Sequence, residues 1–367
     1  MFFRVNDVGN ANYIQIFNAF KNSILTVDFG LQQKNQQKTY FICSFLQSSK
    51  LLISHYHQDH YIGLYYLEDN STHIEELYYP MIPNVTGTSD LKKQVLFLEF
   101  IQNLKLGSKS GSPAKDLIEL TNKKNRIGFK RKALKQGDSI YVGDLKFDVV
   151  WPPEKISTET GRALSKGIKE INDTISSNDA LNELWEAFDR NGNDNVFSNE
   201  EKYVEKNTEQ TRHDHLSYLT AINAFNDVRD DIPDKLITEL SEKIRKLTNR
   251  FSVCLYLHNQ FLFLGDLESN EINRCIEFMK KEYQINHVNN LIAAHHGSHW
   301  GNKLLDIYAE NVISSNGKKL SLHFNETYKQ IGKNIYSTYL NGNLSFSFKG
   351  LRLLYNAEYP YWYLPWF

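Results

Sequence analysis

Cysteine is scarce in this chain of 367 residues, charge is balanced, and no long apolar run occurs. The three cysteines, Cys43, Cys254 and Cys275, are too few and too scattered for a disulfide framework or a Cys-x-x-Cys metal knuckle. With 42 basic and 43 acidic residues the net charge is -1, so bulk charge points to no particular partner.

The sequence also has no stretch near the roughly 18 consecutive apolar residues of a membrane-spanning helix. A strand-like segment, Phe2 to Val8, follows Met1 directly without a basic or apolar leader. We therefore expect an unprocessed, soluble, cytoplasmic protein with no membrane span. Its composition, 41% hydrophobic and 23% charged, is that of a globular chain with a large core and excludes a disordered, collagen-like or coiled-coil protein.

Short apolar runs predict strands in two parts of the chain. In the first part they lie around Ile16, Val27 and Ile53, and the last run ends directly on a group of histidines. Strand patterns return at 134–151, 251–264 and beyond 291, with a helix expected over 270–283. Because α/β folds place their chemistry at strand ends, the histidines after Ile53 mark the first candidate site.

Residues 155–248 differ in character from the rest of the chain. They hold 13 basic and 19 acidic residues, a local charge of -6, with many Asn and several helix-like pieces. We predict an inserted helical subdomain here. It divides the chain into 1–154, 155–248 and 249–367, of which the first and last form one fold.

The most informative motif is the segment 54–60, with the sequence SHYHQDH. Imidazole and carboxylate ligands suit metals such as zinc. A turn at a strand end can aim His55 and His57 at one ion while Asp59 and His60 face another. The spacing therefore predicts a site for two divalent metal ions.

This motif resembles the His-x-His-x-Asp-His signature of the metallo-β-lactamase superfamily of hydrolases. Further motifs follow in an order similar to that of one branch of this superfamily, which includes the hydrolase domain of bacterial competence DNA-uptake proteins and phosphorylcholine esterases. These motifs are 7–12 (DVGNAN), 27–30 (VDFG), 143–144 (GD) leading to 151–153 (WPP), 263–266 (FLGD) and 295–298 (HHGS). The resemblance covers 1–153 and 249–350. It implies an α/β fold of the αββα metallo-β-lactamase sandwich type, interrupted by the helical insertion.

The resemblance implies six metal ligands, His55, His57, Asp59, His60, Asp266 and His323. Asp266 would bridge the two ions. His323 stands where the family has its last ligand, although Phe324 replaces the proline that usually follows. His295 and His296 are interpreted as residues that contact the metal ligands, without binding the metal themselves, or as contacts to a substrate phosphate. The alternative is that one of them binds a metal.

Asn249 departs from the superfamily pattern. Most members have a further histidine in this region, before the bridging aspartate, whereas the DNA-uptake branch shows the same Asn-x-x-Ser pattern as Asn249 to Ser252. Asn249 would then be a weak neutral ligand or no ligand, so the first ion would bind less tightly and manganese would be favoured over zinc. His213 or His215 is the alternative donor for this ion.

Two adjacent cations would lower the pKa of a shared water, so the expected nucleophile is a metal-bound hydroxide. Asp59 would orient it. His296 would stabilise charge on the substrate or protonate the leaving group. No Gly-x-Ser-x-Gly elbow and no suitably placed cysteine offers a competing nucleophile.

A basic stretch favours a phosphate-containing substrate. Positions 123–135 carry seven basic residues and no acid, including Lys130, Arg131 and Lys132, and such a patch can hold a phosphodiester backbone, although a solvated loop explains it equally well. We predict a phosphodiesterase or nuclease acting on nucleic acid, a nucleotide or a phospho-alcohol. The alternatives are a carboxylic ester, lactone or thioester hydrolase and a non-catalytic metal-binding scaffold of a multiprotein assembly.

Two further segments suggest ligands or partners. The loop 189–200 resembles an EF-hand, with candidate calcium ligands at Asp189, Asn191, Asn193, Asn195 and Glu200, and the alternative is an Asx-rich connection between helices. Asp194 replaces the usual glycine, so calcium affinity should be weak. The last nine residues contain six aromatics and either pack on the fold or, like the acidic insertion, contact a protein partner.

Overall fold

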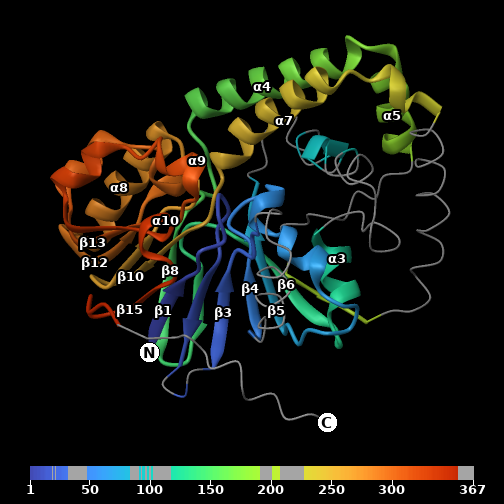
Figure 1. The fold of residues 1–367 in the computed structure, drawn as a ribbon. Helices are drawn as coiled ribbons and strands as arrows, with labels where there is room; N and C mark the ends of the chain where they lie inside the picture. The colour runs from blue at the N-terminus through green and yellow to red at the C-terminus, as the bar shows by residue number, and fades with distance from the viewer. Residues whose placement is uncertain are drawn as a thin grey trace.

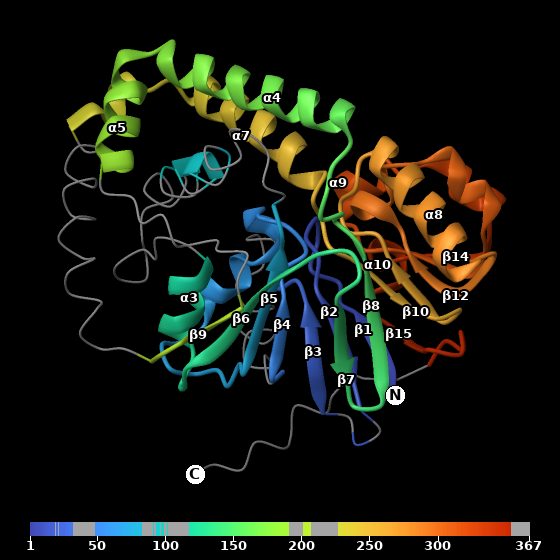
Figure 2. The same ribbon diagram turned by 180° about the vertical axis from the view of Figure 1, so that it is seen from behind.

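Two mixed β-sheets pack face to face in the computed structural model, and helices cover their outer faces (Figures 1 and 2). The structure describes residues 1–18, 20, 22–31, 48–82, 91, 93–95, 97–98, 101, 117–190, 201–206 and 227–353. The predicted α/β class is confirmed.

The first sheet has eight strands in the order β15-β1-β2-β3-β4-β5-β6-β9. These strands are β1 (Phe2–Val5), β2 (Ile14–Phe17), β3 (Ser23–Val27), β4 (Lys50–Leu52), β5 (Glu76–Pro80), β6 (Phe129–Leu134), β9 (Lys202–Val204) and β15 (Leu344–Ser347). Strands β3 to β6 run parallel and the other neighbours are antiparallel. The carboxyl ends of β3, β4 and β5 therefore lie along one edge of the sheet.

The second sheet has seven strands in the order β14-β13-β12-β11-β10-β8-β7. These strands are β7 (Ser139–Val142), β8 (Leu145–Trp151), β10 (Cys254–Leu257), β11 (Phe261–Phe263), β12 (His287–Ile292), β13 (Tyr308–Ser314) and β14 (Gly332–Ser337). Strands β11 to β14 are parallel, and the remaining pairs are antiparallel. Their parallel carboxyl ends form a second edge at which side chains can meet.

Helices connect the strands and cover the sheets. The α-helices are α3 (Leu117–Lys124), α4 (Thr158–Ser176), α5 (Asp179–Arg190), α7 (Asp234–Asn249), α8 (Ser269–Tyr283), α9 (Lys318–Ser321) and α10 (Thr338–Asn341). The short 3₁₀ helices are η1 (Gln58–His60), η2 (Ile62–Tyr66), η3 (Arg229–Asp231), η4 (Ala294–Gly297), η5 (Asn302–Asp306) and η6 (Glu326–Gln330). The helix predicted at 270–283 is thus present as α8.

Successive residues of the central strands face different cores. In β4, Leu51 belongs to the buried cluster that also holds residues of α3, α4, α5 and α7, whereas Leu52 belongs to the core between the sheets. In β10, Tyr256 packs with α8 and Leu255 faces the first sheet. Because both faces of these strands are buried, their sequences read as continuous apolar runs.

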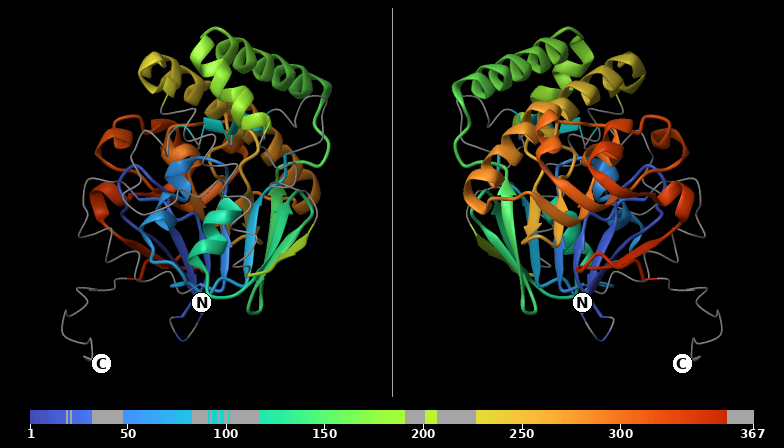
Figure 3. Two further views of the ribbon diagram at one scale, coloured as in Figure 1. Left: turned by 90° about the vertical axis from the view of Figure 1, so that its right-hand side faces the viewer. Right: turned by 90° about the vertical axis from the view of Figure 1, so that its left-hand side faces the viewer.

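The described residues of the predicted insertion include the helices α4, α5 and α7 and the strand β9. Helices α4 and α7 lie side by side across one end of both sheets (Figures 1, 2 and 3). They approach closely at Gly167, where a Cβ would lie 2.7 Å from a Leu247 methyl. Strand β9, which the sequence pattern did not predict, pairs with β6, so the insertion also extends the first sheet.

No helix in the described parts of the chain combines the length and the apolar character needed to cross a bilayer.

Candidate metal centre

The histidine motif follows β4, where the parallel strands of the first sheet end. The Ile53 N–H still donates to the Tyr78 carbonyl at 2.9 Å, so pairing continues one residue beyond β4 before the chain turns. The turn and η1 then bring the rings of His55 and His60 to a centroid distance of 3.9 Å. Both side chains are completely buried.

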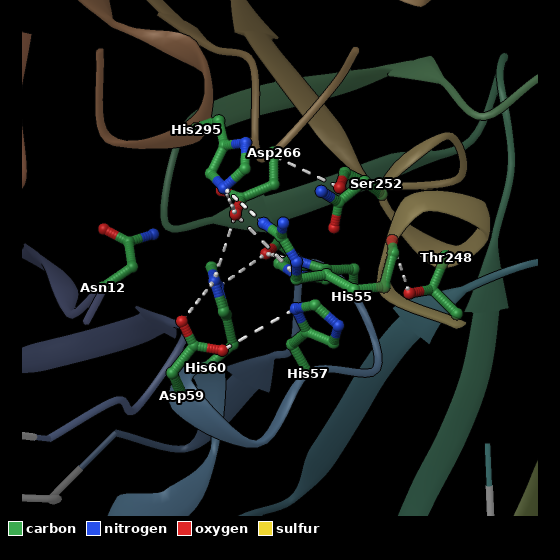
Figure 4. A network of polar contacts seen from close by, with 12 residues as sticks. Asn12, His55, His57, Asp59, His60, Thr248, Ser252, Asp266 and His295 are labelled. Carbon is green, nitrogen blue, oxygen red and sulfur yellow. Dashed lines mark hydrogen bonds and ion pairs between the residues drawn. The ribbon is translucent and has the colours of Figure 1, made fainter. Parts of the chain in front are cut away.

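Asp266 reaches the same place from the second sheet. It follows β11 after Gly265, whose φ of 54° is left-handed, and its N–H donates to Ser252 Oγ at 3.2 Å. Its Oδ2 faces four imidazole nitrogens, at 3.6 Å from Nε2 of His60, 3.7 Å from His295, 3.9 Å from His55 and 3.9 Å from His296. The two halves of the chain thus contribute to one cluster (Figure 4).

Two overlapping groups of side chains in this cluster could hold a metal ion. The first consists of His55, His60 and Asp266, and the second consists of Asp59, His60 and His296. Within each group the candidate ligand atoms all lie within 4.8 Å of one another. The Nε2 atoms of His55 and His60 are buried and have no hydrogen-bond partner among the described residues, so each could bind an ion.

Asp28 orients the histidine motif through hydrogen bonds. It follows β3, beside β4, and its buried carboxylate accepts hydrogen bonds from His60 Nδ1 at 2.7 Å and from Asn12 Nδ2 at 2.7 Å. It also accepts from the backbone N–H of Ser54 at 2.6 Å and the Ser54 hydroxyl at 2.8 Å. Because a carboxylate only accepts, Nδ1 of His60 carries a proton and the ring turns Nε2 toward Asp266.

Gly30, which follows β3, allows the histidine motif with η1 to pack closely against the chain after β3. A Cβ on Gly30 would lie 1.8 Å from the Asp59 carbonyl oxygen and 2.8 Å from the Asn12 carbonyl oxygen. Both obstacles are backbone atoms that cannot rotate away. Only glycine therefore permits the observed position of η1.

His296 is held by its other ring nitrogen. Residues 295 and 296 both have positive φ, 47° and 57°, inside η4. Nδ1 of His296 lies 2.6 Å from the Ser315 carbonyl oxygen and must donate to it, since a carbonyl only accepts. The lone pair of Nε2 therefore faces the cluster, as a metal ligand requires.

His295 has a different hydrogen-bond pattern. Its Nε2 lies 3.3 Å from Nη1 of Arg245, which can only donate, so this nitrogen accepts. His299 Nδ1 lies 3.0 Å from the Leu267 carbonyl oxygen and donates to it, which leaves Nε2 of His299 to accept from Nδ1 of His295 at 2.8 Å. The lone pair of His295 is thus engaged by Arg245, whereas that of His296 is free.

Burial and charge shift several pKa values in the cluster. Burial lowers the pKa of His57 to about 4 and that of His295 to about 3, and it also lowers the pKa of His55. Burial acts against protonation of His60 too, but the carboxylates of Asp28 and Asp266 hold its pKa well above the usual value. Burial would raise the pKa of Asp266, yet the surrounding imidazoles hold it well below its usual range.

The remaining predicted ligands lie in different places. Asp59 is half-exposed at the cluster, with Oδ1 3.8 Å from Nδ1 of His57 and Oδ2 3.9 Å from Nε2 of His60. His323 instead follows the surface helix α9, which buries no residue, and its side chain is exposed. It belongs to neither group, whereas His296 lies in one group with Asp59 and His60.

The basic stretch lies in ordered elements rather than in a solvated loop. Lys130, Arg131 and Lys132 are in β6, where Lys130 is exposed and Arg131 is buried. Lys132 pairs with Asp138 at 3.1 Å, and Lys135 pairs with Glu154 at 2.7 Å. Much of the charge is therefore balanced within the fold, and neither group of the metal centre includes these residues.

Asn249 ends α7 and is completely buried. Its Oδ1 has no hydrogen-bond partner among the described residues, and its Nδ2 lies 3.5 Å from Glu268. His213 and His215 lie outside the described residues, as do the aromatic tail and the candidate calcium ligands Asn191, Asn193, Asn195 and Glu200. Asp189 lies in the last turn of α5, and calcium binding stays a prediction.

Sequence reasoning missed Arg245 and His299 and marked Asp28 only as part of a motif. Arg245 looked like any cation of a helix with apolar spacing, and nothing in its neighbours marks a site. Asp28 did carry a usable signal, since it ends a strand directly before a glycine-containing turn.

Neither a protein-family model nor a curated protein matches the chain.

Proposed function

We propose that this protein is a metal-dependent hydrolase of the metallo-β-lactamase type that cleaves phosphodiesters. Two mixed sheets with helices on their outer faces agree with an αββα sandwich of that type. The convergence of His55 and His60 with Asp266 is the observation that carries the proposal, because the motif order in the sequence implied it.

The residues present fit a pair of divalent ions. Imidazole nitrogens and carboxylate oxygens are ligands for zinc and manganese, and a buried imidazole nitrogen without a partner is costly unless something binds it. His55 and Asp266 would hold one ion, and Asp59 and His296 the other. His60 is in both groups but offers only Nε2, since Nδ1 is bonded to Asp28, so it would bind one ion.

Such ions supply Lewis acidity, and they activate water near neutral pH. The chain supplies the rest. Asp59 presents a half-exposed carboxylate beside the cluster, where it can accept a proton from a reacting water. The cation of Arg245 can hold a substrate oxygen at the same place, and His295, neutral at pH 7, accepts from this guanidinium and so orients it. Asp28 keeps the His60 ring in one orientation throughout.

Metal content and activity test this proposal together. The double variant D59A/H60A removes two candidate ligands from the cluster. A matched control is H73A/E75A, which removes an exposed His–Glu pair 3.6 Å apart on the surface. After incubation with Mn²⁺ or Zn²⁺ and desalting, we expect about two ions per chain in wild type and in the control. We expect the cluster variant to lose metal together with hydrolysis of bis(p-nitrophenyl) phosphate.

A wild-type protein that binds neither metal would contradict the proposal. So would a cluster variant that keeps full phosphodiesterase activity. Metal binding without activity on any phosphodiester or ester substrate would instead favour a non-catalytic scaffold.

A further inference from the structure

Arg245 brings a positive charge from the insertion into the metal centre. It lies in α7, and its Nη1 is 3.3 Å from Nε2 of His295. Its charge is also one of those that lower the pKa of His57, after burial. The same guanidinium therefore acts on imidazoles from both halves of the fold.

No carboxylate neutralises Arg245 within the described chain. Its neighbours on α7 are paired, since Lys243 lies 2.9 Å from Glu239 and Lys246 lies 3.1 Å from Glu242. Arg245 has no such ion pair, and its only side-chain hydrogen bond among the described residues goes to His295. A guanidinium has five N–H donors, so most of them remain available to a ligand.

The helix that carries Arg245 is firmly positioned. Ile244 and Leu247 on α7 are buried in the core that covers the first sheet, and Leu247 contacts α4 at Gly167. Thr248 donates to the carbonyl of Ile244 at 3.1 Å, one turn earlier. Because this end of α7 is held in place by packing, the guanidinium of Arg245 has a defined position at the metal centre, unlike a side chain on the free surface.

We propose that Arg245 binds a negatively charged non-bridging oxygen of a phosphate ester at the metal centre and so selects phosphodiesters over neutral esters. This inference rests on the proposed function. Arginine binds phosphate oxygens through charge-assisted and often bidentate hydrogen bonds. A neutral carboxylic ester or lactone offers no anionic oxygen before reaction, so it gains less from the same cation.

The test compares R245Q and R245M with wild type and with K246Q. K246Q removes a charge from the same helix at an exposed position. All proteins are loaded with the same metal, and their metal content and melting temperature are measured first. Inorganic phosphate binding is then followed by calorimetry, and hydrolysis of bis(p-nitrophenyl) phosphate and p-nitrophenyl acetate is measured in parallel. Two variants of different polarity guard against a folding defect in one of them.

We expect both Arg245 variants to keep their metal but to bind phosphate at least about tenfold more weakly. For the phosphodiester, kcat/KM should fall about 100-fold, while for the neutral ester it should change far less. K246Q should resemble wild type in every measurement. Unchanged phosphate affinity and phosphodiester kcat/KM in a folded, metal-loaded Arg245 variant would overturn the inference.

The two proposals fail in different ways. If wild type hydrolyses no phosphodiester, the proposed function fails, and phosphate binding still decides whether Arg245 is an anion site. If wild type is active and the Arg245 variants match it, only the assignment of Arg245 is wrong.

Discussion

Nδ1 of His60 lies 2.7 Å from Oδ2 of Asp28, and both side chains are completely buried. Asp28 follows β3 and His60 ends the turn that follows β4, so this bond joins the ends of two neighbouring parallel strands. It leaves Nε2 of His60 facing Asp266 at 3.6 Å. One hydrogen bond thus determines how an imidazole from the first sheet meets a carboxylate from the second.

Replacing Asp28 should weaken metal binding without removing a ligand. In D28N the ring of His60 loses a charged acceptor that fixes its orientation, so we expect metal affinity to fall about 10- to 100-fold. Competition with a chromophoric chelator measures this change. D148N is the control, because Asp148 also accepts a side-chain hydrogen bond, from Ser139 at 3.0 Å in the second sheet, and it belongs to neither group of the metal centre. Equal affinities in D28N and wild type would contradict this role for Asp28.

Metal binding should release the proton that His60 carries on Nε2. The pKa of His60 is held above its usual value, so its Nε2 is protonated at pH 7 in the metal-free protein and must lose that proton to bind an ion. His55 and His57 have lowered pKa values and are already neutral, and the Asp266 carboxylate is already ionised.

We therefore expect release of at least about one proton per chain at pH 7, one from His60 and any further proton from water that the ions ionise. Affinity should rise with pH until the pKa of His60 is passed and then level off. Calorimetry in buffers of different ionisation enthalpy counts these protons. Release of no proton, or affinity that does not depend on pH, would show that His60 is not the titrating ligand.

The adjacent residues His295 and His296 should respond differently to alanine. H296A removes a side chain whose Nε2 lone pair faces Asp266, so we expect loss of metal. H295A removes a ring whose lone pair accepts from Arg245, so metal should remain while phosphodiester hydrolysis slows. Metal content measured beside kcat separates the two results. The reverse pattern would make His295 the ligand.

G30A should destabilise the protein markedly. The added Cβ would lie 1.8 Å from a backbone oxygen of the histidine motif, and such overpacking costs about 3 kcal/mol of unfolding free energy. G137A is a suitable control, because Gly137 has open space around it and only its φ of 94° is unfavourable, at a cost of about 1 kcal/mol. Urea unfolding of both variants gives the difference. Equal stability of G30A and wild type would show that η1 can move away from β3.

The sequence predicted the main strands and the histidine cluster because both depend on local signals. Short apolar runs marked β3 and β4, and in β4 both faces are buried, with Leu51 in one core cluster and Leu52 in the other. The spacing of His55 and His60 followed directly from the motif. Patterns among residues that are close in the sequence were enough to predict these features.

Features that depend on tertiary packing were not predictable in the same way. His323 was expected as a ligand, yet the chain after β13 forms the surface helix α9 and leaves its side chain exposed. The cations of β6 looked free in sequence because the basic stretch itself holds no acid, whereas Lys132 pairs with Asp138 in the turn that follows β6. Arg245 reaches the centre only because α7 packs across the sheet ends, and its own neighbours carry no sign of that.

Anomalous scattering from crystals soaked in Mn²⁺ tests the central claim most directly. We predict two strong peaks, one beside Asp266 on the side of His55 and the other between Asp59 and His296. A map with no peak beside Asp266, or with peaks only elsewhere on the molecule, would contradict the metal centre and the hydrolase built on it.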